Sequence, residues 1–304
     1  MKKVAHFISY LFFLFFVGLF AILPFQVVYL ISDGLYFVLF YLVGYRKKVA
    51  FNNLRRSFPD KSEKEIKKIR KKFYRHLADI LVEGIKGFVM TKKQIYKRHH
   101  ITNPELAQKY IDAGQSVIGV VAHYNNWEWG TMSGSTQVNS NVMVLYKPLS
   151  NPFIDKFLKK IRKSFGTELV SIFNTFRAFR ERKDKPYMYV LAADQSPSKV
   201  KRAIWVDFLN QDTACLHGPE KYARLYNYPV LFLNIQKVKR GRYTITGEVL
   251  TESPADLPEG EVTRLYMKRL EKSIRDKPEY WLWSHRRWKK ARRAAQPENT
   301  TKQI

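Results

Sequence analysis

Cysteine is nearly missing from this sequence of 304 residues, since Cys215 is the only one. A single thiol excludes an intramolecular disulfide and a zinc site built from clustered thiolates, so nothing indicates an oxidising compartment. The sequence also lacks a glycine-rich phosphate loop and a His-Glu-x-x-His pair, which mark common nucleotide sites and metalloproteases. Internal repeats and low-complexity linkers are missing too. These absences favour one large domain in the cytoplasm.

Acidic residues are scarce relative to basic ones. The sequence contains 26 Asp and Glu and 54 Lys and Arg, which gives a formal charge of +28 at pH 7. So large an excess predicts a polyanionic neighbour, either nucleic acid or an anionic membrane surface.

Charged side chains are absent altogether between Val4 and Ile31. This stretch exceeds the roughly 20 apolar residues that cross a bilayer. A cleaved signal peptide is the alternative, but the stretch is too long for one and no small-x-small cleavage site follows it. We therefore expect a membrane anchor, which makes nucleic acid the less suitable polyanion.

The sequence leaves open how residues 1–45 meet the membrane. A second apolar stretch, 34–45, is too short for a straightforward span and ends in the basic run Arg46 to Lys48. Lys2 and Lys3 also favour the cytoplasm, so the basic flanks conflict for a single crossing and agree for a hairpin or an interfacial insertion. We expect an anchor of one span or a re-entrant hairpin.

Residues 46–293 have the pattern of a single α/β domain. A capping box, Ser62 with Glu65, predicts the start of a lysine-rich helix, which is either a solvated face or a surface attracted to anionic headgroups. Strand-like runs then alternate with helical patterns, which predicts a mixed β-sheet flanked by helices. The runs cover 142–146, 169–172, 187–193, 229–238 and 243–250, the last two joined as a hairpin. Residues 294–304 have the composition of a frayed tail.

His123 follows an apolar run, 116–122, that predicts a strand buried on both faces. A helix beginning at Trp127 and capped by one of the two preceding asparagines would place His123 at the carboxyl edge of the sheet. An imidazole with an ordinary pKa of about 6.5 can take a proton from an alcohol near neutral pH. The Glu128 carboxylate would fix its tautomer and stabilise the imidazolium. The motif predicts group transfer onto an oxygen or nitrogen; a satisfied structural histidine is the alternative.

Four separate stretches point in one direction. They are His123 to Glu128, Asn151-Pro152 with Asp155 and Arg162, Asp194-Gln195, and residues 278–283 with His285, Arg286 and Arg287. In this order and spacing they resemble the lysophospholipid acyltransferase superfamily, specifically its bacterial lipid A biosynthesis branch. The resemblance covers nearly the whole chain, including the anchor. Glu128 stands where glycerolipid acyltransferases commonly have Asp, which favours the lipid A branch.

The resemblance implies a glycerolipid acyltransferase-like fold and a membrane-bound O-acyltransferase. The enzyme would move a fatty acyl chain from acyl carrier protein or acyl-CoA to a hydroxyl of a lipid A precursor, in lipopolysaccharide biosynthesis. His123 would be the general base supported by Glu128, with no metal, no cofactor and no covalent acyl-enzyme. The expected place is the bacterial inner membrane, with the catalytic domain facing the cytoplasm and anionic lipids as a further partner.

The resemblance also implies substrate-binding residues. Arg162 suits bidentate binding of a phosphate or an oxyanion. Asp194, at the end of the 187–193 run, is a second implied substrate-binding residue, and Gln195 beside it suits hydrogen bonding to polar groups of the acceptor. Asn126 and Arg286 complete the implied substrate-binding set.

The sequence departs from the family pattern at Asn210, where many members have glycine, and at Cys215, which we expect to be a small buried core side chain. These departures leave the substrate range open. One alternative is acylation of a lysophospholipid or an aminoacyl lipid by the same dyad. Another is a non-catalytic membrane tether that binds anionic lipids or nucleic acid through its positive charge.

Overall fold

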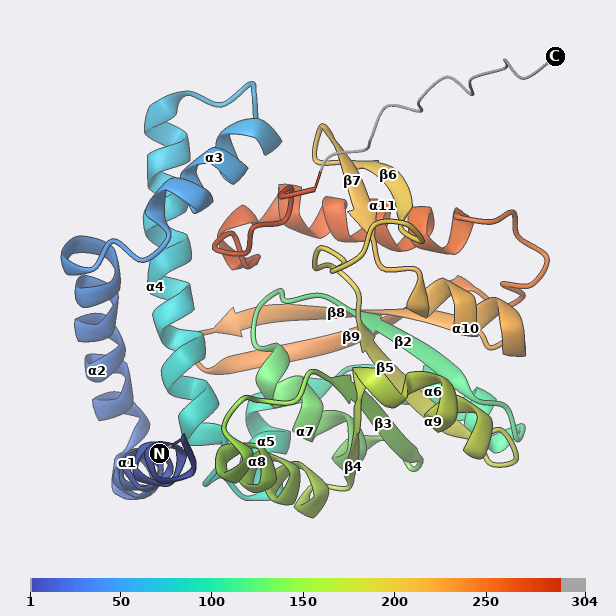
Figure 1. The fold of residues 1–304 in the computed structure, drawn as a ribbon, viewed down its shortest axis with the longest axis horizontal. Coiled ribbons are helices and arrows are strands. Elements are labelled where there is room, and N and C mark those ends of the chain that lie inside the picture. The colour runs from blue at the N-terminus through green and yellow to red at the C-terminus, as the bar shows by residue number, and fades with distance from the viewer. Residues whose placement is uncertain (1, 291–304) are drawn as a thin grey trace, which may run out of the picture.

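A seven-stranded sheet forms the centre of the molecule, in a computed structural model that describes residues 2–290. The tail predicted at 294–304 lies outside the described residues. The strand order is β1-β9-β8-β2-β5-β3-β4, with parallel neighbours except for the antiparallel pair β8 and β9. The predicted mixed sheet and its hairpin are confirmed (Figure 1). The strands are β1 (His99–Ile101), β2 (Val117–Val121), β3 (Asn141–Tyr146), β4 (Thr167–Ser171), β5 (Tyr187–Ala192), β8 (Val230–Lys239) and β9 (Arg242–Thr251).

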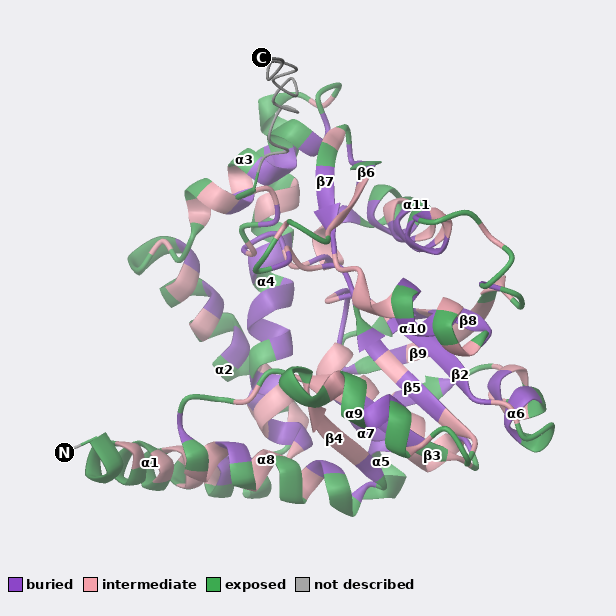
Figure 2. Cartoon of the chain, turned by 45° about the vertical axis from the view of Figure 1, so that its right-hand side comes forward, coloured by how far each residue is buried: buried purple, intermediate pink, exposed green. Residues whose placement is uncertain are grey.

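Helices cover both faces of this sheet. Alternate side chains of β2 point to opposite faces, so Ile118 and Val120 join one hydrophobic cluster while Val117 joins the other. Figure 2 shows the buried residues concentrated along the strands and the inner faces of the helices. The first cluster includes side chains of α9 (Thr175–Glu181), α10 (Gly218–Tyr226) and α11 (Glu261–Asp276), and the second those of α5 (Lys92–Arg98), α6 (Glu105–Asp112), α7 (Trp127–Gln137) and α8 (Pro152–Ser164).

The long helix α4 (Glu63–Gly87) connects the sheet with the amino-terminal helices. The predicted capping box is confirmed, because Ser62 Oγ accepts from the Glu65 backbone and the Glu65 side chain accepts from the Ser62 backbone. α4 packs against α2 (Phe25–Phe37) and α3 (Lys47–Ser57), and stands beside the hairpin end of β8 and β9 (Figure 1). This placement puts α4 between the apolar amino terminus and the carboxyl edge of the sheet.

The amino-terminal apolar region is divided at a different residue from the one expected. α1 (Lys2–Ile22) ends just before Pro24, which has no backbone N–H to continue the helix, and α2 starts at Phe25. Asp33 therefore lies inside α2, where it pairs with Arg240 at 2.7 Å. The second apolar stretch is correspondingly longer than predicted, because α2 continues into the π-helical turn η1 (Val38–Leu42).

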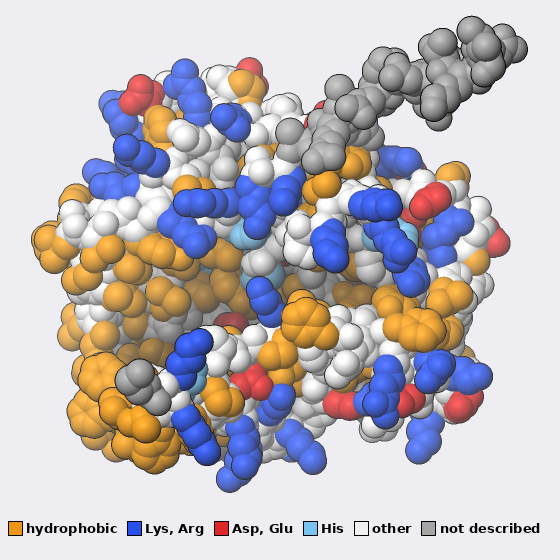
Figure 3. All heavy atoms as spheres, viewed as in Figure 1, with side chains coloured by type: hydrophobic (Ala, Val, Ile, Leu, Met, Phe, Trp, Pro, Cys, Tyr) orange, Lys and Arg blue, Asp and Glu red, His pale blue; other side chains and the backbone are white. Residues whose placement is uncertain are grey.

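Both apolar segments, Lys2–Ile22 with 21 residues and Phe25–Leu42 with 18, are long and apolar enough to cross a membrane by length and composition. They suggest association with a membrane. α1 contacts the α/β domain along α8, where Phe7 and Phe13 pack on Phe153 and Phe157 respectively. Figure 3 shows hydrophobic side chains gathered over α1 and α2, while Lys and Arg side chains are spread over the rest of this face. The membrane topology of residues 1–45 stays a prediction.

A separate two-stranded hairpin, β6 (Ile204–Phe208) and β7 (Gln211–Cys215), was not expected from the sequence. Its two-residue turn places Leu209 at φ 52° and Asn210 at φ 61°, both in the left-handed region. Paired positive φ values match the twist of a tight hairpin, and asparagine tolerates them better than most residues. At the end of the hairpin Cys215 is 1% exposed, as expected of a core side chain.

Candidate active site

The turn between β2 and α7 carries His123 and follows the predicted local structure. β2 ends at Val121 and α7 begins at Trp127. Asn126 caps the helix, with its Oδ1 accepting from the backbone N of Trp129 at 2.9 Å. Because β2 lies in the middle of a parallel set of strands, this turn lies at the carboxyl edge of the sheet, where α/β proteins usually place their sites.

His123 is paired with Asp194, not with Glu128, so Asp194 is a partner of the base and not the substrate-binding residue that was expected. Its Nδ1 lies 2.7 Å from Asp194 Oδ1, and its backbone N donates to Asp194 Oδ2 at 3.1 Å. Asp194 follows β5, the parallel neighbour of β2, so the two strand ends bring the side chains together. The side chain of Asp194 is 2% exposed and that of His123 is 21% exposed. The carboxylate is thus enclosed while the imidazole keeps an open side.

The Asp194 contact determines how the imidazole can act. A carboxylate can only accept, so Nδ1 carries the proton and Nε2 is left as the basic nitrogen. Burial lowers the pKa of His123, but the charge and hydrogen bond of Asp194, with the charge of Glu128, outweigh burial and leave it raised. The dyad therefore favours an imidazole that readily takes up a proton at Nε2.

Glu128 has a different partner from the one expected. Its Oε2 accepts from Arg162 Nη2 at 2.5 Å, and Arg162 Nε also donates to Thr131 Oγ1 at 3.2 Å. Glu128 lies in the first turn of α7 and Arg162 near the end of α8, so this pair joins two helices beside the His123 turn. The expectation that Glu128 fixes the tautomer of His123 is corrected, because Asp194 makes that hydrogen bond. The charge of Glu128 still acts on His123 through space.

The carboxyl-terminal segment encloses the dyad from another side. Trp281 Nε1 donates to Asp194 Oδ2 at 2.9 Å, and Leu282 N donates to the carbonyl oxygen of His123 at 3.1 Å. Nearby, His285 Nε2 accepts from Ser196 N at 3.1 Å, and burial lowers the pKa of His285 to about 4. Trp281 is a site residue that sequence reasoning did not single out. Its only signal was its place in the aromatic run of residues 278–283.

Comparison with known protein families now adds to this geometry. A family model described as bacterial lipid A biosynthesis acyltransferase matches residues 1–290. The chain belongs to this family. Among individual curated proteins the comparison found no significant match. Membership supports an acyltransferase activity directed at lipid A, in agreement with the resemblance stated from the sequence.

The acyltransferase brings four of its predicted site residues together. His123, Asp194, Glu128 and Arg162 form two adjacent pairs at the carboxyl edge of the sheet. Gln195 follows Asp194 directly and is partly exposed. Its contact with substrate stays a prediction, as does that of Arg162.

Of the two other predicted substrate-binding residues, Asn126 lies differently from expectation, while substrate contact by Arg286 stays a prediction. Asn126 has no exposed surface, and its amide is engaged by Trp129 and Glu83, so it shapes the turn rather than facing a substrate. Arg286 is exposed, whereas its neighbour Arg287 is buried and donates to Ala214 O at 2.6 Å. Position in a motif did not reveal which side of the chain each side chain would take.

A protein site for a transition metal would need several His, Cys, Asp or Glu side chains close together. Within residues 2–290, no group of three or more His, Cys, Asp or Glu side chains is arranged to hold a metal ion. The expectation that the reaction needs no metal and no cofactor stays a prediction.

Proposed function

We propose that this acyltransferase moves a fatty acyl chain from the thioester of acyl carrier protein to a hydroxyl of a lipid A precursor. The observation that carries the proposal is the His123–Asp194 pair, held at 2.7 Å at the carboxyl edge of the sheet in a chain of this family. Such a pair gives a neutral imidazole whose Nε2 accepts a proton and whose imidazolium is stabilised by the carboxylate.

The reaction proceeds in two steps. As the acceptor oxygen bonds to the thioester carbonyl carbon, its proton passes to Nε2 of His123 and a tetrahedral intermediate forms. The C–S bond then breaks, the carbonyl forms again, and the imidazolium returns the proton to the departing sulfur. Products are the O-acylated lipid and the free thiol of the carrier. Asp194 stays ionised throughout. Its lowered pKa supports this, because the interactions with His123 and Trp281 lower that pKa by more than burial raises it.

Glu128 supports the base electrostatically in this account. Its charge raises the pKa of His123, and its ion pair with Arg162 fixes α7 relative to α8. Arg162 remains the candidate for contact with a phosphate or an oxyanion, since its guanidinium has further donors and lies beside the dyad.

The whole chain suits a membrane-embedded, anionic acceptor. Two apolar helices precede the catalytic domain, and the chain has a formal charge of +28. A basic protein attracts the acidic carrier, the phosphates of the acceptor and anionic lipids. We propose that the enzyme acts at the cytoplasmic face of the bacterial inner membrane. Acylation of a lysophospholipid or an aminoacyl lipid is the second candidate, because the same dyad would serve any hydroxyl or amine acceptor.

Mass spectrometry of cellular lipids tests the acceptor. Lipid A and total phospholipids are compared in cells with and without the gene, complemented by the wild type or by His123→Ala. We expect lipid A to lose one acyl chain, which only the wild type restores. Intact lipid A together with an altered phospholipid or aminolipid would contradict the lipid A proposal and favour the second candidate.

A further inference from the structure

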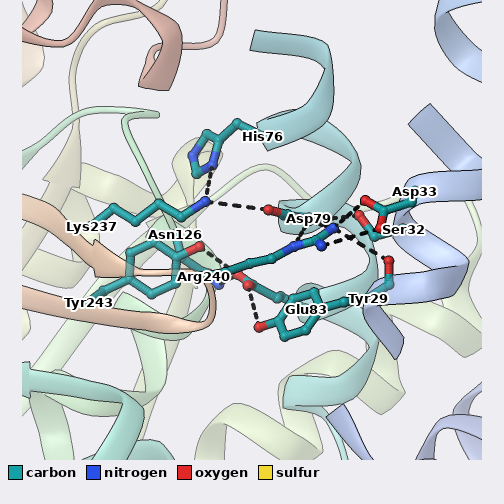
Figure 4. A network of polar contacts seen from close by, with 10 residues as sticks. All are labelled: Tyr29, Ser32, Asp33, His76, Asp79, Glu83, Asn126, Lys237, Arg240 and Tyr243. Atoms are coloured by element: carbon teal, nitrogen blue, oxygen red, sulfur yellow. Dashed lines mark hydrogen bonds and ion pairs between the residues drawn. The ribbon is translucent and has the colours of Figure 1, made fainter. Parts of the chain in front are cut away.

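A carboxylate lies buried between the second apolar helix and the turn that carries His123. Glu83, near the end of α4, has no exposed surface. Its Oε2 accepts from Asn126 Nδ2 at 2.7 Å and from the Tyr243 hydroxyl at 2.8 Å, and its Oε1 accepts from the Tyr29 hydroxyl at 2.9 Å. Figure 4 shows these donors converging from α2, β9 and the start of α7.

Asn126 is the residue through which Glu83 reaches the site. It lies three positions after His123 and two before Glu128. Its Oδ1 caps α7, and its carbonyl oxygen accepts from His99 Nε2 at 3.0 Å. The amide and the carbonyl oxygen of Asn126 therefore form hydrogen bonds within the protein interior. Displacement of the amide would move the residues on either side of it.

Burying the Glu83 carboxylate at this position costs free energy of desolvation. Burial, followed by the charge of Asp79, raises the pKa of Glu83 to about 7, against the hydrogen bonds of the two tyrosines and the charge of Lys237. Arg98 on α5 is a further cation that interacts with Glu83. Buried carboxylates usually lose more in desolvation than they gain, so packing alone would favour an apolar side chain here. What an apolar residue could not supply is an acceptor for the Asn126 amide.

We propose that Glu83 is a positioning residue for acyl transfer: through Asn126 it holds the turn between β2 and α7, and through Tyr29 it joins that turn to the apolar helix α2. The inference rests on the proposed role of His123 as the base. Proton transfer needs the acceptor hydroxyl within hydrogen-bond reach of Nε2, so a displaced turn lowers kcat. KM changes little, because Glu83 touches no surface that a substrate can reach.

Reversing the direction of one hydrogen bond tests the proposal. Asn126→Asp keeps the cap on Trp129 but removes the amide donor to Glu83 and leaves two carboxyl groups that repel each other or compete for one proton, so we expect kcat to fall by about 10- to 100-fold. Glu83→Gln alone can keep its oxygen toward Asn126 and should lower kcat less than about fivefold. In the double variant the amide introduced by Glu83→Gln donates to the carboxylate introduced by Asn126→Asp, so kcat should recover by at least about tenfold over Asn126→Asp alone.

Glu220→Gln is the matched control. Glu220 is 1% exposed, and it accepts from the backbone N and hydroxyl of Thr263 at 2.9 and 2.6 Å, on a different helix pair. We expect it to lower the midpoint of thermal unfolding and to leave kcat of the folded enzyme unchanged. If Asn126→Asp behaves like this control, or if the double variant is no faster than Asn126→Asp, Glu83 is merely structural and the proposal is wrong.

A second readout separates this inference from the proposed function. The ¹⁵N resonances of the His123 ring should shift in Asn126→Asp and return toward the wild-type values in the double variant. If the wild type transfers no acyl chain to a lipid A precursor, the proposed function fails, while these resonances still report whether Glu83 holds His123. Unchanged resonances in Asn126→Asp would overturn the positioning role.

Discussion

Two carboxylates act on His123 in different ways. Asp194 binds Nδ1 directly and fixes which nitrogen is basic, whereas Glu128 acts only through its charge while its oxygen binds Arg162. Asp194 therefore both orients the base and makes the larger contribution to its raised pKa, and the charge of Glu128 adds a smaller one. The same residue-scale arrangement makes the pH dependence of the reaction testable.

Glu128→Gln should move the acidic limb of the kcat/KM profile to lower pH. The charge of Glu128 raises the pKa of His123, so its removal lowers that pKa, and the imidazole stays unprotonated at lower pH. The positive charge of Arg162, no longer paired with Glu128, would also lower the pKa of His123. Glu181→Gln, which removes an exposed carboxylate paired with Arg177, is the control and should leave the limb in place. A limb that shifts upward would refute this role of Glu128.

The sequence singled out His123, Asp194, Glu128 and Arg162 but did not reveal which of them form pairs, and it missed Trp281. His123 and Glu128 are neighbours in the sequence, so a local motif suggests that they interact. The pairing with Asp194 depends on β2 lying beside β5, which is a property of strand order and register. The burial of Asn126 depends on α4, which precedes it by many residues. Long-range packing of this kind leaves no short sequence signal.

At the scale of elements, the turn of the β6–β7 hairpin is set by two residues with left-handed backbone. Leu209 and Asn210 have φ values of 52° and 61°, and Asn210 Nδ2 also donates to Ser57 O at 3.1 Å. The side-chain contact links the hairpin to the end of α3. Asparagine here combines tolerance of the backbone conformation with a tertiary hydrogen bond.

Asn210→Ala should lower the free energy of unfolding by about 1–2 kcal/mol, because alanine is strained at positive φ and cannot bind Ser57. Asn210→Gly is the matched control, since glycine accepts the backbone conformation and loses only the hydrogen bond. Thermal unfolding of the detergent-solubilised variants gives the comparison. Equal losses for alanine and glycine would show that backbone strain contributes nothing at this turn.

Sequence patterns predicted the elements that have a long or strongly capped signal. The β8–β9 hairpin and the capped start of α4 are examples. The β6–β7 hairpin was missed because its turn lacks glycine, and β1 because a strand of three residues carries no measurable alternation. The helix break at Pro24 was missed because Asp33 looked like the end of the apolar stretch. Its charge is in fact accommodated by Arg240.

For the molecule as a whole, apolar and basic surfaces lie on connected elements. α2 packs along α4, whose amino-terminal half carries exposed lysines. A chain with apolar helices and a charge of +28 can bind a bilayer both by insertion and by attraction to anionic headgroups. The two contributions differ in their response to salt, because only the second is screened.

Neutralising exposed lysines of α4 should weaken binding to anionic vesicles. Replacement of Lys64, Lys68 and Lys71 by Gln is expected to cost about 1 kcal/mol per lysine at low salt, with little effect on neutral vesicles. Vesicle sedimentation across a salt series measures the change. Replacement of exposed Lys268, Lys272 and Lys277 in and after α11 is the control. Equal losses for both sets would show that the charge acts uniformly and that α4 makes no particular contact with the membrane.

The central claim is that His123, oriented by Asp194, is the base for acyl transfer. The most direct test is the rate of transfer from acyl carrier protein thioester to a lipid A precursor by the purified wild type, Asp194→Asn and His123→Ala. Asparagine would donate to Nδ1 and put the proton on Nε2, so we predict that kcat falls by about a thousandfold or more in Asp194→Asn and at least as far in His123→Ala. Retention of more than about a tenth of the wild-type rate by either variant would contradict the account.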